Sequence, residues 1–166
     1  MSAVAPSSPY KGLSPFGDSE LDALLFFGRE RDQEIVVANL IASRLTVLYG
    51  PSGVGKSSLL QAGVARTLRE LPERPLVVVF SSWGDDPAEA LARDLAHAAG
   101  VEAGTLLDTI RSAEALHGDV YLVLDQAEEY FLYHPEGSAF EDGLAAVLSE
   151  PLRANVLLSL REDALA

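Results

Sequence analysis

The fold is decided by one short segment, Gly50-Pro51-Ser52-Gly53-Val54-Gly55-Lys56-Ser57. It follows an apolar run, Leu45–Tyr49, and precedes Lys56–Leu71, in which apolar residues recur at helical spacing. Glycines let the backbone curl so that its N–H groups converge on a phosphate, and the following helix points the positive end of its dipole there. G-x4-G-K-S between a strand and a helix is therefore the pattern of a phosphate-binding loop (P-loop), and a glycine-rich turn without a ligand is disfavoured.

The P-loop assigns a role to each kind of residue in it. Lys56 supplies positive charge to the β- and γ-phosphates, and Ser57 offers a hydroxyl ligand to Mg²⁺. The residues that we expect to bind the nucleotide phosphates are Gly50, Pro51, Ser52, Gly53, Val54, Gly55, Lys56, Ser57 and Ser58.

Three further apolar runs follow along the chain, at Leu76–Phe80, Val120–Leu124 and Val156–Leu160. Like Leu45–Tyr49, they are continuous rather than alternating, which is typical of strands buried on both faces of a parallel sheet. Helical patterns lie between the runs, so the sequence predicts an α/β domain with helices on both faces of a mainly parallel sheet of about four strands. Ligands of such sheets bind at the carboxyl ends of the strands, where we expect the functional residues.

The expected helices are Glu30–Ser43, Lys56–Leu71, one from Asp86 to about Gly100, one within Gly104–Leu116 and one from Ser138 to just before Pro151. The first presents Val36, Val37, Leu40 and Ile41 on one side. Asp86-Pro87-Ala88-Glu89 and Ser138-Ala139-Phe140-Glu141 resemble capping boxes. Residues 1–20 are rich in Ser, Pro and Gly and are expected to form an irregular lead-in to one domain, 21–166.

Composition limits the class of protein. The 166 residues carry a net charge of −13 and are 48% apolar, which excludes a disordered chain and argues against a nucleic-acid or anionic-membrane partner. The chain lacks cysteine, so disulfides and thiolate metal sites are excluded, and His97, His117 and His134 are too scattered for a metal site. Neither a membrane-length apolar run nor a signal-peptide pattern occurs, and we expect a cytoplasmic protein.

Acidic residues follow the third apolar run. Asp125 ends that run, and a carboxylate at the tip of a buried strand costs free energy unless it meets a cation or a donor. This is the Walker B arrangement, in which the acid helps to hold Mg²⁺; a turn-capping Asp is the alternative. Either Glu128 or Glu129 could polarise an attacking water, with Glu128 preferred, although both also suit the start of a helix.

Three strings together resemble a known family, the STAND NTPases (signal transduction ATPases with numerous domains). Besides the P-loop, they are Leu124-Asp125-Gln126-Ala127-Glu128-Glu129 and Phe26-Phe27-Gly28-Arg29-Glu30. The lead-in Tyr10-Lys11-Gly12-Leu13-Ser14-Pro15-Phe16 resembles that of the bacterial novel STAND branch, and the resemblance extends from Tyr10 to Leu165.

The resemblance implies further site residues. Phe27, Gly28, Arg29 and Glu30 would lie beside the adenine and ribose, unless this segment is a helix start with a surface Arg–Glu pair. Arg161, after the fourth apolar run, would be a sensor of the γ-phosphate, unless it pairs with Glu162 or Asp163. Gln126 departs from the broader AAA+ pattern, which has Glu there, so hydrolysis would depend on Glu128 or Glu129, or be slow.

The family also implies an architecture and a function. Its sheet order is 5-1-4-3-2, followed by a lid and a winged helix, so this chain would be an incomplete core whose first strand is an exposed edge. The implied ligands are ATP or ADP with Mg²⁺, bound with modest affinity, and the implied function is a switch whose oligomerisation depends on the nucleotide. Its partners would be copies of itself or other domains of a longer chain.

Other functions stay open at this stage. A small-molecule kinase would need an acceptor pocket and a lid, neither of which is recognisable, and a GTPase would need an Asn-Lys-x-Asp motif, which is absent. A scaffold that binds nucleotide without hydrolysing it is kept open by Gln126. Trp83 follows the second apolar run, where packing beneath the next helix is favoured over contact with a nucleotide or partner.

Overall fold

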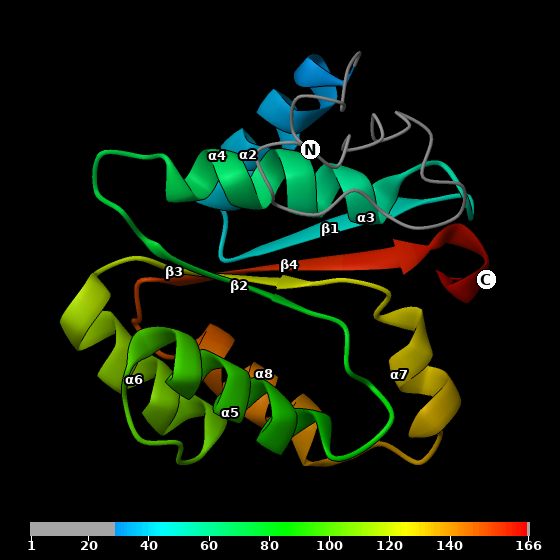
Figure 1. Ribbon diagram of the computed structural model, residues 1–166. Coiled ribbons are helices and arrows are strands. Elements are labelled where there is room, and N and C mark those ends of the chain that lie inside the picture. Colours follow the sequence, from blue (N-terminus) through cyan, green and yellow to red (C-terminus); the bar gives the residue numbers. More distant parts are fainter. Residues whose placement is uncertain (1–28, 166) are drawn as a thin grey trace, which may run out of the picture.

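The computed structural model describes residues 29–165, which form an α/β fold in three layers (Figure 1). Its central sheet has four parallel strands in the order β1-β4-β3-β2. The strands are β1 (Leu45–Gly50), β2 (Leu76–Phe80), β3 (Val120–Leu124) and β4 (Ala154–Arg161). The predicted fold class and strand positions are confirmed, and β4 begins two residues earlier than its apolar run. The lead-in, Phe27 and Gly28 lie outside the described residues.

Helices cover both faces of the sheet, as predicted (Figure 1). One face carries α2 (Glu30–Ala42) and the helix after the P-loop, and the other carries α5 (Pro87–Ala99), α6 (Leu106–His117) and α8 (Ala139–Ser149). A short helix that the sequence pattern did not show, α7 (Glu128–Tyr133), lies at the carboxyl end of β3. Within residues 29–165, no helix is long and apolar enough to span a bilayer.

The helix after the P-loop is not a uniform α-helix. It consists of α3 (Lys56–Ser58), a π-helical segment (Leu59–Ala65) and α4 (Arg66–Arg69). Gln33 of α2 packs so closely against this helix that a Cβ added at Gly63 would lie 2.8 Å from the Gln33 Oε1 atom. The Gln33 side chain also donates to the Thr67 hydroxyl at 2.5 Å. A glycine at this position therefore permits the close approach of the two helices.

Local capping sets the helix boundaries. The Asp86 carboxylate accepts hydrogen bonds from the N–H groups of Ala88 and Glu89, and α5 ends at Gly100, which has a φ of 70°. The Ser138 hydroxyl likewise accepts from the Phe140 N–H at the start of α8. Both predicted N-caps are confirmed, since each side-chain oxygen satisfies a donor that the first helical turn leaves unpaired.

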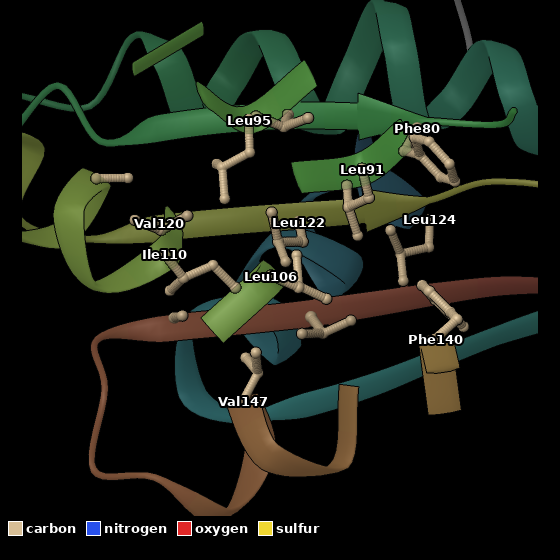
Figure 2. Close-up of a cluster of buried hydrophobic side chains, with 14 of the residues drawn as sticks. Phe80, Leu91, Leu95, Leu106, Ile110, Val120, Leu122, Leu124, Phe140 and Val147 are labelled. Atoms are coloured by element: carbon tan, nitrogen blue, oxygen red, sulfur yellow. The ribbon is translucent and has the colours of Figure 1, made fainter. Parts of the chain in front are cut away.

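Two apolar clusters hold the layers together. The larger lies between the sheet and helices α5, α6 and α8 (Figure 2); its labelled members are Phe80, Leu91, Leu95, Leu106, Ile110, Val120, Leu122, Leu124, Phe140 and Val147. The smaller lies on the opposite face and joins α2 and the P-loop helix to alternate residues of the strands, such as Tyr121, Val123 and Leu157. Each fully buried aliphatic side chain contributes about 1.5–3 kcal/mol, so the sheet is fastened on both faces.

The prediction that the strands are buried on both faces is confirmed for β3, in which every residue is buried. The same prediction is wrong for β1. Leu45, Val47 and Tyr49 of β1 are 41%, 46% and 64% exposed. Among the described residues, β1 pairs with β4 alone, and an apolar run does not reveal where its strand lies in the sheet. Ile41 is also 44% exposed, because it lies about 100° around α2 from the buried Leu40.

Candidate functional site

The P-loop follows β1 directly and curls as its glycines require. Gly53 and Gly55 have φ angles of 77° and 79°, a left-handed backbone conformation that residues other than glycine rarely adopt. The Lys56 ammonium folds back over the loop and donates to the carbonyls of Gly50 at 2.9 Å and Pro51 at 2.8 Å. These bonds place the lysine charge within the loop, at the carboxyl end of β1.

Arg29 lies on the P-loop. Its Nη1 donates to the Val54 carbonyl at 2.5 Å, and its Nη2 lies 3.0 Å from an Asp32 carboxylate oxygen. A Cβ added at Gly55 would lie 3.4 Å from Arg29 Nη1, so the guanidinium covers this glycine. Arg29 and the phosphate loop, 25 residues apart in sequence, therefore form one cluster. Glu30 begins α2 at the same place.

Asp125 stands at the carboxyl end of β3 and is only 2% exposed. Its Oδ1 accepts a hydrogen bond from the Gln126 N–H at 2.9 Å, and its own N–H donates to the Phe80 carbonyl at 2.8 Å. Side chains alternate across a strand, and Val123 packs toward the P-loop helix, so the Asp125 side chain points to that same face. The structure thus places the strand-end carboxylate on the side of Lys56 and Ser57.

These residues fit a bound Mg²⁺. A buried carboxylate that has one neutral donor retains unused acceptor capacity, and hard cations prefer such oxygen ligands. Within the described part of the chain, no group of three or more His, Cys, Asp or Glu side chains could hold a metal ion by itself. Asp125 and Ser57 would hold the cation together with oxygens from outside the protein, which is typical of Mg²⁺ bound with nucleotide phosphates.

Glu128 and Arg161 are brought together from different parts of the chain. Glu128 begins α7, and its Oε2 accepts a hydrogen bond from the Arg161 backbone N–H at 3.3 Å. The Arg161 guanidinium is turned to Asp163, with Nε and Nη2 at 3.1 and 2.5 Å from its two carboxylate oxygens. The surface pairing that the sequence left open as an alternative is therefore present. Glu129 follows on α7 and is partly buried.

Sequence reasoning missed Ser159 altogether and missed one contact of Trp83. Ser159 on β4 is fully buried, and its Oγ has no hydrogen-bond partner among the described residues. Its carbonyl accepts from the Ala127 N–H at 2.9 Å. It lies two residues after Leu157 and so points to the P-loop face of the sheet. Trp83 packs in the core, as predicted, but its indole N–H also donates to the Asp125 carbonyl. A serine inside an apolar run was the one available signal.

A separate cavity of about 250 Å³ lies beside β2 and is lined by Gln61, Arg69, Val79 and Ser81. Arg69 also donates to the Val77 carbonyl at 3.3 Å, at the outer edge of β2. Of the sequence-predicted site residues that the structure describes, none lines this cavity.

A parallel α/β sheet with a P-loop after its first strand and an acid at the end of β3, separated from β1 by β4, defines a P-loop NTPase. The chain belongs to one family of that class, novel STAND NTPase 1, whose sequence pattern it matches over residues 9–166.

Solved structures show the same fold. A Walker-type ATPase of Pyrococcus abyssi is 18% identical in sequence, with a TM-score of 0.60. The match covers 89% of this chain and 48% of the ATPase chain. The ORC1 protein of Aeropyrum pernix, solved in complex with DNA, is 19% identical in sequence, with a TM-score of 0.58. The match covers 82% of this chain and 40% of the ORC1 chain. This chain thus spans about half the length of these structures or less. Comparison with curated proteins found no match.

Proposed function

We propose that this chain is the ATP- and ADP-binding core of a STAND-type signalling switch that hydrolyses ATP slowly with Mg²⁺. The observation that carries the proposal is that the P-loop with Lys56 and its two left-handed glycines follows the carboxyl end of β1, while the buried Asp125 follows the carboxyl end of β3, and these ends lie at the same end of a parallel sheet. Backbone N–H groups, Lys56 and Arg29 supply local positive charge, so a polyanion can bind despite the net charge of −13. Membership of an NTPase family supports this assignment.

Each residue then has a defined part in hydrolysis. Lys56 and the loop N–H groups hold the phosphates, and Asp125 with Ser57 holds the cation, which when bound neutralises phosphate charge. The Glu128 carboxylate accepts a hydrogen bond from the attacking water, whose oxygen forms a bond to the γ-phosphorus as the bond to the β-phosphate oxygen breaks. Arg161 reaches the γ-phosphate after it releases Asp163.

Nucleotide binding and phosphate release test this assignment. Lys56→Ala should weaken ATP binding about 10- to 100-fold, the loss expected for a charged hydrogen bond of about 1.5–3 kcal/mol. Glu128→Gln should leave binding intact and lower the hydrolysis rate by about 10²-fold or more. Arg93→Ala removes an exposed cation from α5, which lies on the opposite face of the sheet, and is the matched control. Equal phosphate release by the wild type and both site variants would refute ATPase activity.

A second function, nucleotide binding without hydrolysis, is favoured by one contact. The preferred water-polarising acid, Glu128, bonds to the Arg161 N–H, and the residue after Asp125 is Gln126 rather than an acid. Glu129→Gln measured beside Glu128→Gln separates the possibilities. A rate that falls only in Glu129→Gln reassigns the acid to Glu129, whereas wild-type ATP binding without phosphate release identifies a scaffold.

Oligomerisation is the finer part of the proposal, and the apolar outer edge of β1 supports it. Exposed apolar edge strands tend to pair with other chains, and Val47 is 46% exposed at the centre of β1. Light scattering after gel filtration should show larger species with an ATP analogue than with ADP, and Val47→Lys should abolish them. Leu116→Lys alters an apolar residue on α6 that is 66% exposed, more than Val47, and should not abolish them. Unchanged assembly in Val47→Lys would exclude β1 as the contact.

We also propose that nucleic acid is not a partner, although the ORC1 structure contains DNA. The charge of −13 makes approach to a polyanionic duplex unfavourable. Fluorescence anisotropy with labelled duplex DNA at low salt should show no binding, and saturable binding there would overturn this view.

A further inference from the structure

Trp83 holds the backbone of Asp125 from the β2 side of the sheet. It is the one tryptophan of the chain and is 1% exposed. Its indole Nε1 donates to the Asp125 carbonyl at 2.8 Å, and the Asp125 N–H donates to the Phe80 carbonyl, also at 2.8 Å. Both backbone groups of Asp125 are thus bonded to residues at the carboxyl end of β2 or just beyond it.

The turn after Asp125 is strained and needs such restraints. Gln126 has a φ of 55°, a left-handed conformation that costs a residue other than glycine on the order of 1–3 kcal/mol. Four hydrogen bonds hold it there. The Trp83 indole donates to the Asp125 carbonyl, and the Gln126 N–H donates to Asp125 Oδ1. The Ala127 N–H donates to the Ser159 carbonyl, and the Glu129 N–H donates to the Gln126 carbonyl. The Asp125 carboxylate is itself part of this turn, so its direction depends on the peptide that Trp83 holds.

The same tryptophan contacts α7, the helix that begins with Glu128. Its ring meets Tyr130 edge-on with a centroid separation of 6.0 Å, and the His134 Nε2 donates to its carbonyl at 2.8 Å. Tyr130 and His134 stack on each other at 5.2 Å. Phe140 of α8 belongs to the same aromatic cluster, with its ring centroid 5.4 Å from that of Trp83 and 5.3 Å from that of Tyr130. Trp83 therefore links the strand-end acid to the helix that carries the proposed water-polarising acid.

We propose that Trp83 is a positioning residue for the Mg²⁺–nucleotide site: its indole N–H fixes the turn that aims the Asp125 carboxylate. This assignment rests on the proposed function for the identity of the ligand. A tryptophan that served for core packing alone would be replaced adequately by another aromatic ring, whereas a positioning tryptophan requires the N–H donor. The two roles therefore predict different behaviour in Trp83→Phe.

The experiment compares Trp83→Phe with Phe140→Leu. Trp83→Phe keeps an aromatic ring but removes the donor, and Phe140→Leu removes a ring from the same cluster but keeps the bond to Asp125. Isothermal titration measures ATP binding without Mg²⁺ and then the Mg²⁺ concentration that gives half-maximal enhancement. Hydrogen–deuterium exchange of the peptide over residues 124–129, without any ligand, reports the turn directly.

We expect Trp83→Phe to bind ATP without Mg²⁺ within about twofold of wild type and to require about 10-fold more Mg²⁺, the usual effect of losing a residue that orients a metal ligand. Exchange over 124–129 should be faster in Trp83→Phe and unchanged in Phe140→Leu. Phe140→Leu should lower the melting temperature and leave the Mg²⁺ requirement unaltered. A wild-type Mg²⁺ requirement in Trp83→Phe, or an equal shift in both variants, would overturn the proposal.

The remaining outcomes are also decisive. If Trp83→Phe does not fold, His134→Phe takes its place, because it keeps the stack on Tyr130 and removes the hydrogen bond to the Trp83 carbonyl. A raised Mg²⁺ requirement in His134→Phe supports the role of Trp83 in linking Asp125 to α7. An unchanged Mg²⁺ requirement refutes it. If the wild type binds no ATP, or binds it as well after Lys56→Ala, the proposed function fails. Exchange over 124–129 in the variants then still decides whether Trp83 holds the turn.

Discussion

Replacing Asp125 with Asn should stabilise the ligand-free protein while it weakens the response to Mg²⁺ and nucleotide. The carboxylate is 2% exposed and is bonded to one neutral donor, the Gln126 N–H. Asn has the same shape and can still accept that hydrogen bond through its carbonyl oxygen, but it carries no charge. The substitution therefore removes a carboxylate, a group that is costly to bury, and keeps the shape of the side chain.

The magnitude follows from the contacts. An under-satisfied buried polar group costs about 1–3 kcal/mol, and more when it is charged, while the amide N–H donors of Asn keep part of this cost, so Asp125→Asn should raise the free energy of unfolding by at most about 1–3 kcal/mol. In a domain of this size, each kcal/mol corresponds to a rise in melting temperature of about 2–4 °C. The wild type should gain about 2.7 kcal/mol from a ligand at 100 times its Kd, and the variant should lose the part of this gain that depends on Mg²⁺.

Thermal unfolding with and without ATP and Mg²⁺ measures both effects. Asp119→Asn is the matched control, because Asp119 precedes the opposite end of β3 and makes an exposed ion pair with Arg153 at 2.8 Å. Asp119→Asn should change the free energy of unfolding by no more than about 1 kcal/mol, both with and without ATP and Mg²⁺. A ligand-free Asp125→Asn protein that melts below the wild type would refute the reasoning, and so would an undiminished response to Mg²⁺.

Three more predictions follow from single contacts. Ser159→Ala should leave the free energy of unfolding in urea unchanged or raise it by up to about 1 kcal/mol, because the buried hydroxyl has no hydrogen-bond partner within residues 29–165; a lower free energy of unfolding would reveal one. Asp86→Ala should cost about 1 kcal/mol by removing the cap of α5, whereas Asp85→Ala, an exposed neighbour, should cost less than about 0.5 kcal/mol by the same assay. Burial chiefly raises the pKa of Tyr130 above its ordinary 10.0, so the stability that it contributes is full below pH 10 and is lost as pH rises toward the folded-state pKa. Tyr130→Phe should therefore lose less stability than the wild type between pH 9 and pH 11, and parallel losses would contradict the assignment.

Much of the fold was predictable because its signals are local. Apolar runs mark all four strands, and the oxygens of Asp86 and Ser138 mark helix starts, since a cap depends on donors two or three residues away. The P-loop is equally local: its left-handed glycines and Lys56 lie within one short segment. Such features need no knowledge of distant neighbours.

What escaped prediction depends on packing. The apolar pattern did not show that β1 lies at the sheet edge, a place that only the family's strand order implied, and the π-helical segment lies where Gly63 lets Gln33 approach. Neither neighbour relationship is written in a periodic pattern. The ion pair of Arg161 with Asp163 was foreseen as an alternative, but only the structure could choose it over other partners within reach.

The sequence by itself determined the class of protein and the chemistry available to it, because the P-loop, the strand-end acid and the alternation of strands and helices are encoded in consecutive residues. Only the tertiary structure decided how the site is held. In the folded chain the Trp83 indole N–H donates a hydrogen bond to the carbonyl of Asp125, 42 residues away in sequence. The Arg161 backbone N–H donates one to the Glu128 carboxylate, 33 residues away. Contacts at such separations depend on the order of strands and the packing of layers, which arise when the whole chain folds.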